Sequence, residues 1–314
     1  IAATFCMFSI FGNDSIQTIG IFLNSNKKVE WWKMWIFMSV FFIITILFGY
    51  FYNNHRIDFN LLENVQDIKN IGLLHFLSPV ILIVLSYFKI PVSTTFLVIC
   101  VFVNMDTINL MLKKTFLGYL VGFTFSAIEW ALVYKFLPSL IGEVRVEDVD
   151  SVQSNRWKIA AWFSTAALWI AWIMQNNLNI AVYLPRIMTV YDLFLFMLLA
   201  LMILAFVFYN RGGPIQNVVK EKKNLTDYRT IVLINFSFAV LIAAFKSANN
   251  IPMATTWMFL GILGGREFIL VELENKKVDS AKHMKTIYSI FKDIALASLG
   301  IIISLLFAKL GKFL

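Results

Sequence analysis

The sequence predicts an all-α membrane protein that crosses the bilayer many times and is built from two inverted repeats. Three observations support this fold class: an apolar composition, several apolar runs long enough to span a membrane, and polar interruptions that recur at a nearly constant spacing. Of the 314 residues, 59% are hydrophobic and only 15% are charged, and the mean hydropathy is +0.75. A soluble domain carries about 25% charged residues, so this composition suits lipid rather than water as the solvent.

The net charge of +8 would suggest nucleic-acid binding in a soluble protein. Here the basic residues lie between the apolar runs, where membrane topology explains them better, and we expect no nucleic-acid partner. Cys6 and Cys100 both lie inside apolar runs and suit neither a metal site nor a disulfide framework. The sequence contains no H-E-x-x-H motif and no paired histidines, so we expect neither an enzyme nor a bound cofactor.

A spanning helix needs about 20 apolar residues, and four uninterrupted runs reach that length. They are residues 33–52, 115–137, 190–209 and 288–308. Two more runs, 1–24 and 157–185, are long enough but are interrupted by polar residues. The last two, 71–104 and 230–265, each consist of two apolar arms that meet at a proline.

The interruptions occur in the same order in each half of the chain. The spacing from Asn13 to Asn176 along the sequence nearly equals the spacing from Pro91 to Pro252. Similar landmarks in one order with a near-constant offset indicate an internal repeat. We therefore predict a first transmembrane repeat at 1–140, a cytoplasmic linker at 141–155, and a second, inverted transmembrane repeat at 156–314.

Each repeat would contain a broken transmembrane helix, a continuous span, a helical hairpin around the proline, and a final span. Because the hairpin enters and leaves at one face, each repeat crosses the membrane an odd number of times, which inverts the second repeat. Most of the 27 basic residues would then share one face, the cytoplasmic one. This prediction puts both termini outside, Lys114 in an outer loop and Arg266 in a cytoplasmic loop. We expect a multi-pass protein of the plasma membrane, which is the inner membrane in a Gram-negative cell.

Polar residues at membrane depth are costly and usually functional. Gly12, Asn13 and Asp14, with Gln17 one turn later, can unwind a helix, because the side chains compete for backbone hydrogen bonds. Freed carbonyls and one carboxylate would suit a hard cation, although these residues could instead lie at the outer surface. The matching string at 175–179 interrupts the second repeat and could instead provide hydrogen bonds between helices.

Hydroxyl residues follow each hairpin proline. They are Ser93, Thr94 and Thr95 in the first repeat, and Thr255 and Thr256 in the second. Proline suits the first position of a helix, whose free amides bind anions. Two such tips facing each other would hold an oxyanion between them, whereas an ordinary tight turn would hold none. Lys89 and Lys246, near the tips, could attract an anion, replace a cation, or extend to the membrane interface.

These strings resemble two signatures of the inorganic phosphate transporter family (PiT). The sequence N-D-S-I-Q-T-I-G at 13–20 resembles the family's G-A-N-D-V-A-N-A-I-G, and I-P-V-S-T-T at 90–95 resembles its P-V-S-T-T-H. The family carries both signatures twice, in inverted repeats, and the resemblance covers nearly the whole chain. It implies uptake of phosphate, or of sulfate as in some members, coupled to sodium or protons.

The resemblance also implies which residues bind the substrate and the coupling cation near the membrane centre. The implied substrate-binding residues are Asn13, Asn176, Ser93, Thr94, Thr95, Thr255 and Thr256. The implied cation-binding residues are Asp14, Gln17 and Asn177, with Asp14 as the position for a sodium ion. A homodimer in the lipid bilayer is compatible with the resemblance.

The chain departs from the family at several of these positions. Asn177 stands where the family has a second aspartate, Phe96 and Trp257 replace its histidines, and Ala254 replaces a serine. With one carboxylate fewer, the chain would couple fewer cations, use a proton, or carry a different substrate. We expect a secondary active transporter of phosphate or a similar tetrahedral oxyanion, working by alternating access. The alternatives are an anion channel or uniporter, and a non-transporting receptor or subunit derived from the transporter fold.

Overall fold

The computed structural model describes residues 2–13, 17–63, 65, 72–87, 92–136, 155–212, 227–274 and 280–310. Regular structure in these ranges is helical. The first half contains α1 (Ala2–Asn13), α2 (Ile19–Ser25), α3 (Trp31–Tyr52), α4 (Leu73–Tyr87), α5 (Thr94–Ile99) and α6 (Met105–Phe136). The second half contains α8 (Asn155–Asn176), α9 (Leu178–Ala181), α10 (Val190–Tyr209), α12 (Tyr228–Ala248), α13 (Thr255–Glu274) and α14 (Ser280–Leu310).

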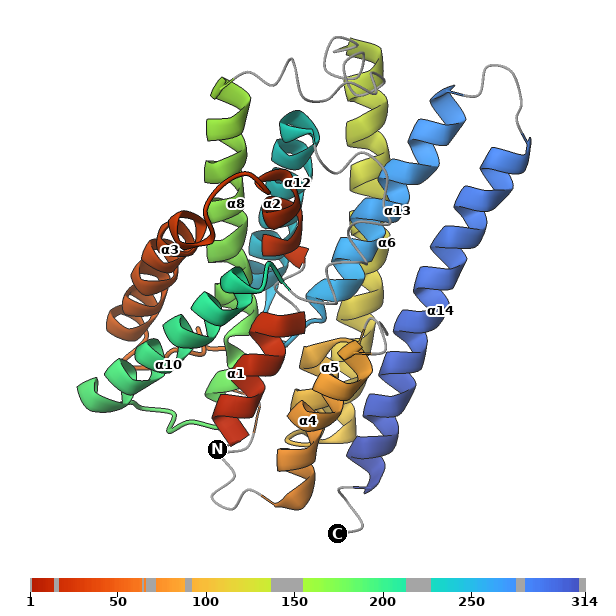
Figure 1. Cartoon of the computed structure of the whole chain (residues 1–314). Coiled ribbons are helices and arrows are strands. Elements are labelled where there is room, and N and C mark those ends of the chain that lie inside the picture. The colour runs from red at the N-terminus through yellow and green to blue at the C-terminus, as the bar shows by residue number, and fades with distance from the viewer. Residues whose placement is uncertain are drawn as a thin grey trace.

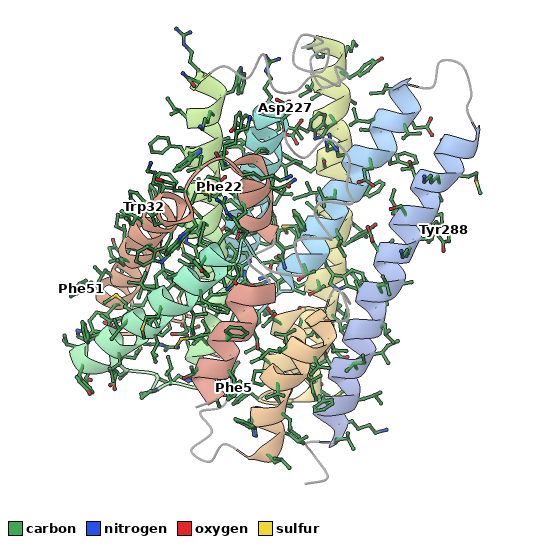
Figure 2. All side chains as sticks on the ribbon, in the orientation of Figure 1. Phe5, Phe22, Trp32, Phe51, Asp227 and Tyr288 are labelled. Carbon is green, nitrogen blue, oxygen red and sulfur yellow. The ribbon has the colours of Figure 1, made fainter. Side chains whose placement is uncertain are left out.

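Six of the described helical segments are long and apolar enough to cross a membrane. They are Trp31–Tyr52, Met105–Phe136, Asn155–Ala181, Val190–Tyr209, Tyr228–Ala248 and His283–Leu310. Large apolar side chains cover their outer surfaces, and Trp32, Phe51 and Tyr288 point away from the helices (Figure 2). Such a surface is stable in lipid and not in water. The predicted all-α, multi-pass membrane protein is therefore confirmed.

The two hairpins occupy different levels of the molecule. In Figure 1, α4 and α5 lie in the lower half, and α13 rises from the centre to the upper end. The start of α1 and the end of α14 both lie at the lower end (Figure 1). Helix α5 contacts α9, and α13 contacts α8, so both hairpins reach the interrupted span of the second half.

Helix packing comes in matched sets, both within each half and between the halves. Helix α1 packs on α4 as α8 packs on α12, and α5 packs on α14 as α13 packs on α6. Likewise α1 contacts α10 as α8 contacts α3, and α2 contacts α8 as α9 contacts α1. Each helix has a counterpart at the same place in the other half; α8, for example, is the counterpart of α1. The two contacts of a set are formed by counterpart helices.

Helices α6 and α13 pack so closely that their backbones touch. Gly261 and Gly265 lie on one face of α13, since they are four residues apart. A Cβ atom added at Gly261 would clash with the carbonyl oxygen of Tyr119, and one added at Gly265 would clash with that of Phe123. Small residues at this spacing permit close helix packing in membranes. The second hairpin is therefore fixed along α6 by its α13 arm.

Two predicted loop residues lie instead inside helices. Helix α6 begins at Met105, ahead of the predicted 115, so Lys114 is helical and only 7% exposed. Arg266 lies within α13 and is 3% exposed. Both predictions were wrong because buried partners compensate the charges: Lys114 contacts oxygen atoms, and Arg266 stacks over the Trp130 ring at 4.6 Å. The predicted linker at 141–155 lies outside the described residues apart from Asn155.

Candidate functional site

The residues of the predicted site whose side chains are described lie where α2, α5, α9 and α13 begin and α8 ends. All of these side chains are buried, from 1% exposure at Thr94, Thr95, Asn176 and Thr255 to 9% at Thr256. Polar groups at this depth need hydrogen-bond partners within the protein or from a ligand. Asp14 lies outside the described residues, and Asn13 is described only as the last residue of α1.

One group of contacts joins the first helix break to the second hairpin. Gln17 Nε2 donates to Thr256 Oγ1 at 2.8 Å. Thr255 Oγ1 lies 3.1 Å from Gln17 Oε1 and 3.2 Å from Asn176 Oδ1, and its hydroxyl can donate to either. The start of α13 is thus hydrogen bonded both to the segment before α2 and to the end of α8.

A second contact joins the opposite pair of elements. Asn179 Nδ2, in α9, donates to Thr95 Oγ1, in α5, at 3.2 Å. The spacing from Thr95 to Thr256 along the sequence nearly equals the spacing from Gln17 to Asn179. In each contact an amide of one half binds a hairpin threonine of the other half. We call these contacts, Gln17–Thr256 and Asn179–Thr95, the crossed pairs.

Asn179 is a site residue that the sequence analysis included in the string 175–179 but did not name among the binding residues. The family signature has no amide at that place in the second repeat, so the resemblance did not mark it. The usable signal was its spacing from Gln17, which nearly equals the spacing between the two threonines.

The second helix break is narrower than the sequence indicates. Asn177 alone separates α8 from α9, and its N–H donates to the Ile173 carbonyl at 2.9 Å. Ala181 N in turn donates to the Asn177 carbonyl at 2.9 Å, so helical hydrogen bonding continues across the interruption. The Asn177 side chain donates to the Ile57 carbonyl at 2.6 Å. No described hydrogen bond joins Asn177 to Gln17, the other described residue of the predicted cation site.

The three hydroxyls of the first hairpin have different surroundings. Ser93 Oγ caps α5 by accepting from Phe96 N at 3.3 Å, a use that fits a helix N-cap. Thr95 binds Asn179, while Thr94 Oγ1 has no partner among the described residues. Gln175 is 0% exposed, and neither its Nε2 nor its Oε1 has a partner there. Buried polar groups without partners cost free energy, so Thr94 and Gln175 are candidates for ligand contact.

Helix α6 holds the second hairpin tip through two adjacent residues. Lys114 Nζ donates to Asn249 Oδ1 and to the Ile251 carbonyl, both at 2.8 Å, and to the Asn249 carbonyl at 3.3 Å. Thr115 Oγ1 accepts from Ala254 N at 3.2 Å. These bonds fix the backbone immediately before Thr255. Of the two lysines predicted near the tips, Lys246 lies 5.9 Å over the Phe59 ring, and Lys89 lies outside the described residues.

No protein-family model matches the sequence, and no curated protein matches it. The structure does match a solved structure, "The sodium-dependent phosphate transporter", with a TM-score of 0.61 at 14% sequence identity. The match covers 98% of this chain and 97% of that chain. An identity this low shows a common fold alone. The chain therefore has a membrane-transporter fold similar to that of the sodium-dependent phosphate transporter, which confirms at the level of fold the resemblance seen in the signatures.

Proposed function

We propose that this protein is a secondary active transporter that moves phosphate, or a similar tetrahedral oxyanion such as sulfate, across the plasma membrane. The observation that carries the proposal is the crossed pairs, Gln17–Thr256 and Asn179–Thr95. A site formed by elements of both halves can open to either side in turn when the halves rock against each other. This is the requirement for alternating access.

The chemistry of the crossed pairs favours an oxyanion. The threonine hydroxyls and the Asn and Gln amides can donate hydrogen bonds to a tetrahedral anion, so the site needs no side chain with a formal positive charge. Thr255 and Thr256 are also the first two residues of α13, whose N-terminal end carries partial positive charge. The fold shared with a sodium-dependent phosphate transporter supports phosphate as the first substrate to test.

The coupling ion in this proposal is sodium or a proton, with Asp14 as the carboxylate that binds it. A bound cation would raise the affinity for the anion by reducing its net charge, and the anion would raise the affinity for the cation equally. Asn177 supplies no second carboxylate, which favours fewer sodium ions or proton coupling.

We further propose that the halves are inverted repeats, at 1–140 and 156–314, with both termini outside and the linker 141–155 in the cytoplasm. The matched helix packing supports this topology. So does the position of the start of α1 and the end of α14 at one end of the molecule (Figure 1). An even number of crossings places both ends on one side.

Uptake of labelled phosphate by proteoliposomes tests the proposal. Uptake is measured with an inward sodium gradient, with an inward proton gradient, and with neither, and with excess unlabelled sulfate as competitor. Accumulation that needs one gradient would support coupled transport and identify the ion. Equilibration without accumulation would indicate a uniporter or channel. Phosphate binding without any uptake would indicate a non-transporting receptor.

A further inference from the structure

A carboxyl group far from the crossed pairs lies within a predicted membrane span. Glu129 belongs to α6 and lies seven residues before its last residue, Phe136, which is about 10 Å along the helix. Lys114, which holds the second hairpin tip, lies fifteen residues earlier, about 22 Å away along α6. Glu129 is half-buried. A carboxyl at such a position is costly as an ion and commonly belongs to a proton or ion path.

The partner of Glu129 is a hydroxyl on a neighbouring helix. Both carboxyl oxygens lie 2.7 Å from Oγ of Ser237 in α12. The same Ser237 Oγ lies 2.8 Å from the Leu233 carbonyl, one turn earlier in α12. One hydroxyl hydrogen therefore faces three acceptor oxygens if Glu129 is ionised.

Protonation of Glu129 resolves this shortage of hydrogens. The carboxyl O–H then donates to Ser237 Oγ, and the Ser237 hydroxyl donates to the Leu233 carbonyl. One hydrogen then lies between a carboxyl oxygen and Ser237 Oγ, and another lies between Ser237 Oγ and the Leu233 carbonyl. The contact between the second carboxyl oxygen and Ser237 Oγ is the one that has none. The arrangement of these atoms thus fits a neutral carboxylic acid better than a carboxylate.

The charged groups of the surrounding helices are not in ion-pair contact with Glu129 in the described part of the chain. Among the described residues, no basic side chain forms an ion pair with it. On α13, Arg266 lies over the ring of Trp130, the residue that follows Glu129. The other titratable residues of these three helices are Asp106, Lys113, Lys114, Tyr119, Tyr134 and Lys135 on α6, Tyr228, Arg229 and Lys246 on α12, and Glu267, Glu272 and Glu274 on α13.

A second polar group lies beside this carboxyl. Ser126 precedes Glu129 by three residues, so the two are neighbours on the helix surface. Its hydroxyl is completely buried and has no partner among the described residues. The Ser126 hydroxyl can therefore form a hydrogen bond with one more donor or acceptor beside Glu129. A carboxyl that exchanges a proton requires such a neighbouring group.

We propose that Glu129 is a proton-binding site and that its proton is the ion coupled to transport. This inference rests on the proposed transport function and differs from it in one respect: the coupling ion is a proton, and Glu129 rather than Asp14 is the carboxyl that binds it. Glu129 takes a proton from water when the site is accessible from one side and returns it to water on the other side, and no other bond changes. The carboxyl that Asn177 does not provide is thus supplied by another helix.

The structure also offers a route from this proton to the crossed pairs. The close glycine packing fixes α13 to α6, whereas Glu129–Ser237 is a hydrogen bond between α6 and α12. When Glu129 is ionised, it can no longer donate a hydrogen bond to Ser237, and it attracts water. Both effects weaken the attachment of α6 to α12. Helix α12 leads directly into the hairpin tip that precedes Thr255.

The test uses the Glu129→Gln variant of the full chain in proteoliposomes. An amide keeps the shape of the neutral acid but cannot release a proton. Two transport readings are compared: exchange of labelled for unlabelled phosphate without a gradient, and accumulation driven by a proton gradient. We expect E129Q to keep exchange, and its accumulation ratio to fall to about one, the value without coupling. Asp106→Asn, at the exposed start of α6, is the matched control and should keep both.

Proton-driven accumulation by E129Q equal to that of the unsubstituted protein would overturn the inference. If the unsubstituted protein exchanges no phosphate at all, the proposed function fails, and infrared titration then decides the proton site separately. A protonated-carboxyl band that titrates with pH and is missing in E129Q would support the site. No such band at any pH at which the protein is folded would overturn it.

Discussion

The hydroxyl of Thr255 lies 3.1 Å from Oε1 of Gln17, although these residues are 238 positions apart in the chain. The same hydroxyl lies 3.2 Å from Oδ1 of Asn176. A single hydrogen is thus shared between amide oxygens that come from the two interrupted spans. An anion between the hairpins would accept this hydrogen in place of an amide oxygen.

Replacement of Thr255 by valine removes this hydroxyl and keeps the side-chain shape. A hydrogen bond to a charged ligand contributes about 1.5 to 3 kcal/mol, so we expect the Kd for phosphate to rise at least about tenfold. Binding to purified protein by calorimetry measures the change. Thr124→Val is the control, because Thr124 is exposed and bonds only within α6. Equal Kd values for the two variants would remove Thr255 from the site.

The crossed pairs predict a specific pattern of energetic coupling. Gln17→Leu and Thr256→Val should be non-additive in the free energy of unfolding, by about 0.5 to 1.5 kcal/mol. Asn179→Leu and Thr95→Val should be non-additive by a similar amount. Gln17→Leu combined with Thr95→Val should be additive, because no hydrogen bond joins these two residues. The observed pairing would be contradicted if the unfolding free energies were non-additive for Gln17→Leu with Thr95→Val and additive within both crossed pairs.

Lys114→Met removes the ammonium that binds three oxygen atoms of the second hairpin tip. We expect faster amide hydrogen exchange at residues 249–254 and weaker phosphate binding, because the tip backbone loses its attachment to α6. Hydrogen-exchange mass spectrometry locates the change. Lys113→Met is a matched control, since Lys113 is the adjacent residue and is exposed. Unchanged exchange at the tip would show that Lys114 does not hold it.

The glycine packing between α6 and α13 predicts a difference between two neighbouring positions. Gly265→Ala should lower the free energy of unfolding by about 1 to 3 kcal/mol, because its Cβ would meet the Phe123 carbonyl oxygen. Gly264→Ala should be tolerated, since its Cβ would lie 3.5 Å from the nearest Phe123 side-chain atom. Thermal unfolding in detergent compares them. A larger loss for Gly264→Ala would contradict the packing.

Asn177→Asp restores the carboxylate of the family signature. The Asn177 amide now donates to the Ile57 carbonyl at 2.6 Å, and a carboxylate there would face an acceptor that repels it. A cation between the two oxygens would relieve this repulsion, so we expect a steeper dependence of phosphate uptake on sodium. Uptake measured against sodium concentration tests it. An unchanged dependence would count against the lost carboxylate as the reason for altered coupling.

Much of the fold could be predicted from the sequence because long apolar runs and repeated polar interruptions are local signals. Helices α3 and α10, for example, begin and end within a few residues of the predicted 33–52 and 190–209. The threonines after Pro252 were correctly expected to lie at a buried hairpin tip. These features need no knowledge of what packs against them.

The remaining features depend on partners distant in the sequence. Lys114 and Arg266 were placed in loops because a charge normally ends an apolar run, whereas the oxygen atoms of the tip and the ring of Trp130 favour their burial. The narrow interruption at Asn177 depends on its bond to Ile57, 120 residues away. The Glu129–Ser237 contact joins the span predicted at 115–137 to an arm of the second hairpin, and the sequence analysis gave neither residue a role.

The close packing of α6 on α13 also bears on how the chain is assembled in the membrane. Helix α6 is synthesised with the first half, yet the face that packs on the glycines of α13 and the ammonium of Lys114 have their described partners in the second half. Until α13 is inserted, α6 presents a poorly packed surface and an uncompensated cation to lipid or to the insertion machinery. The first half made alone should therefore be degraded, and co-synthesis of both halves as separate chains should rescue it.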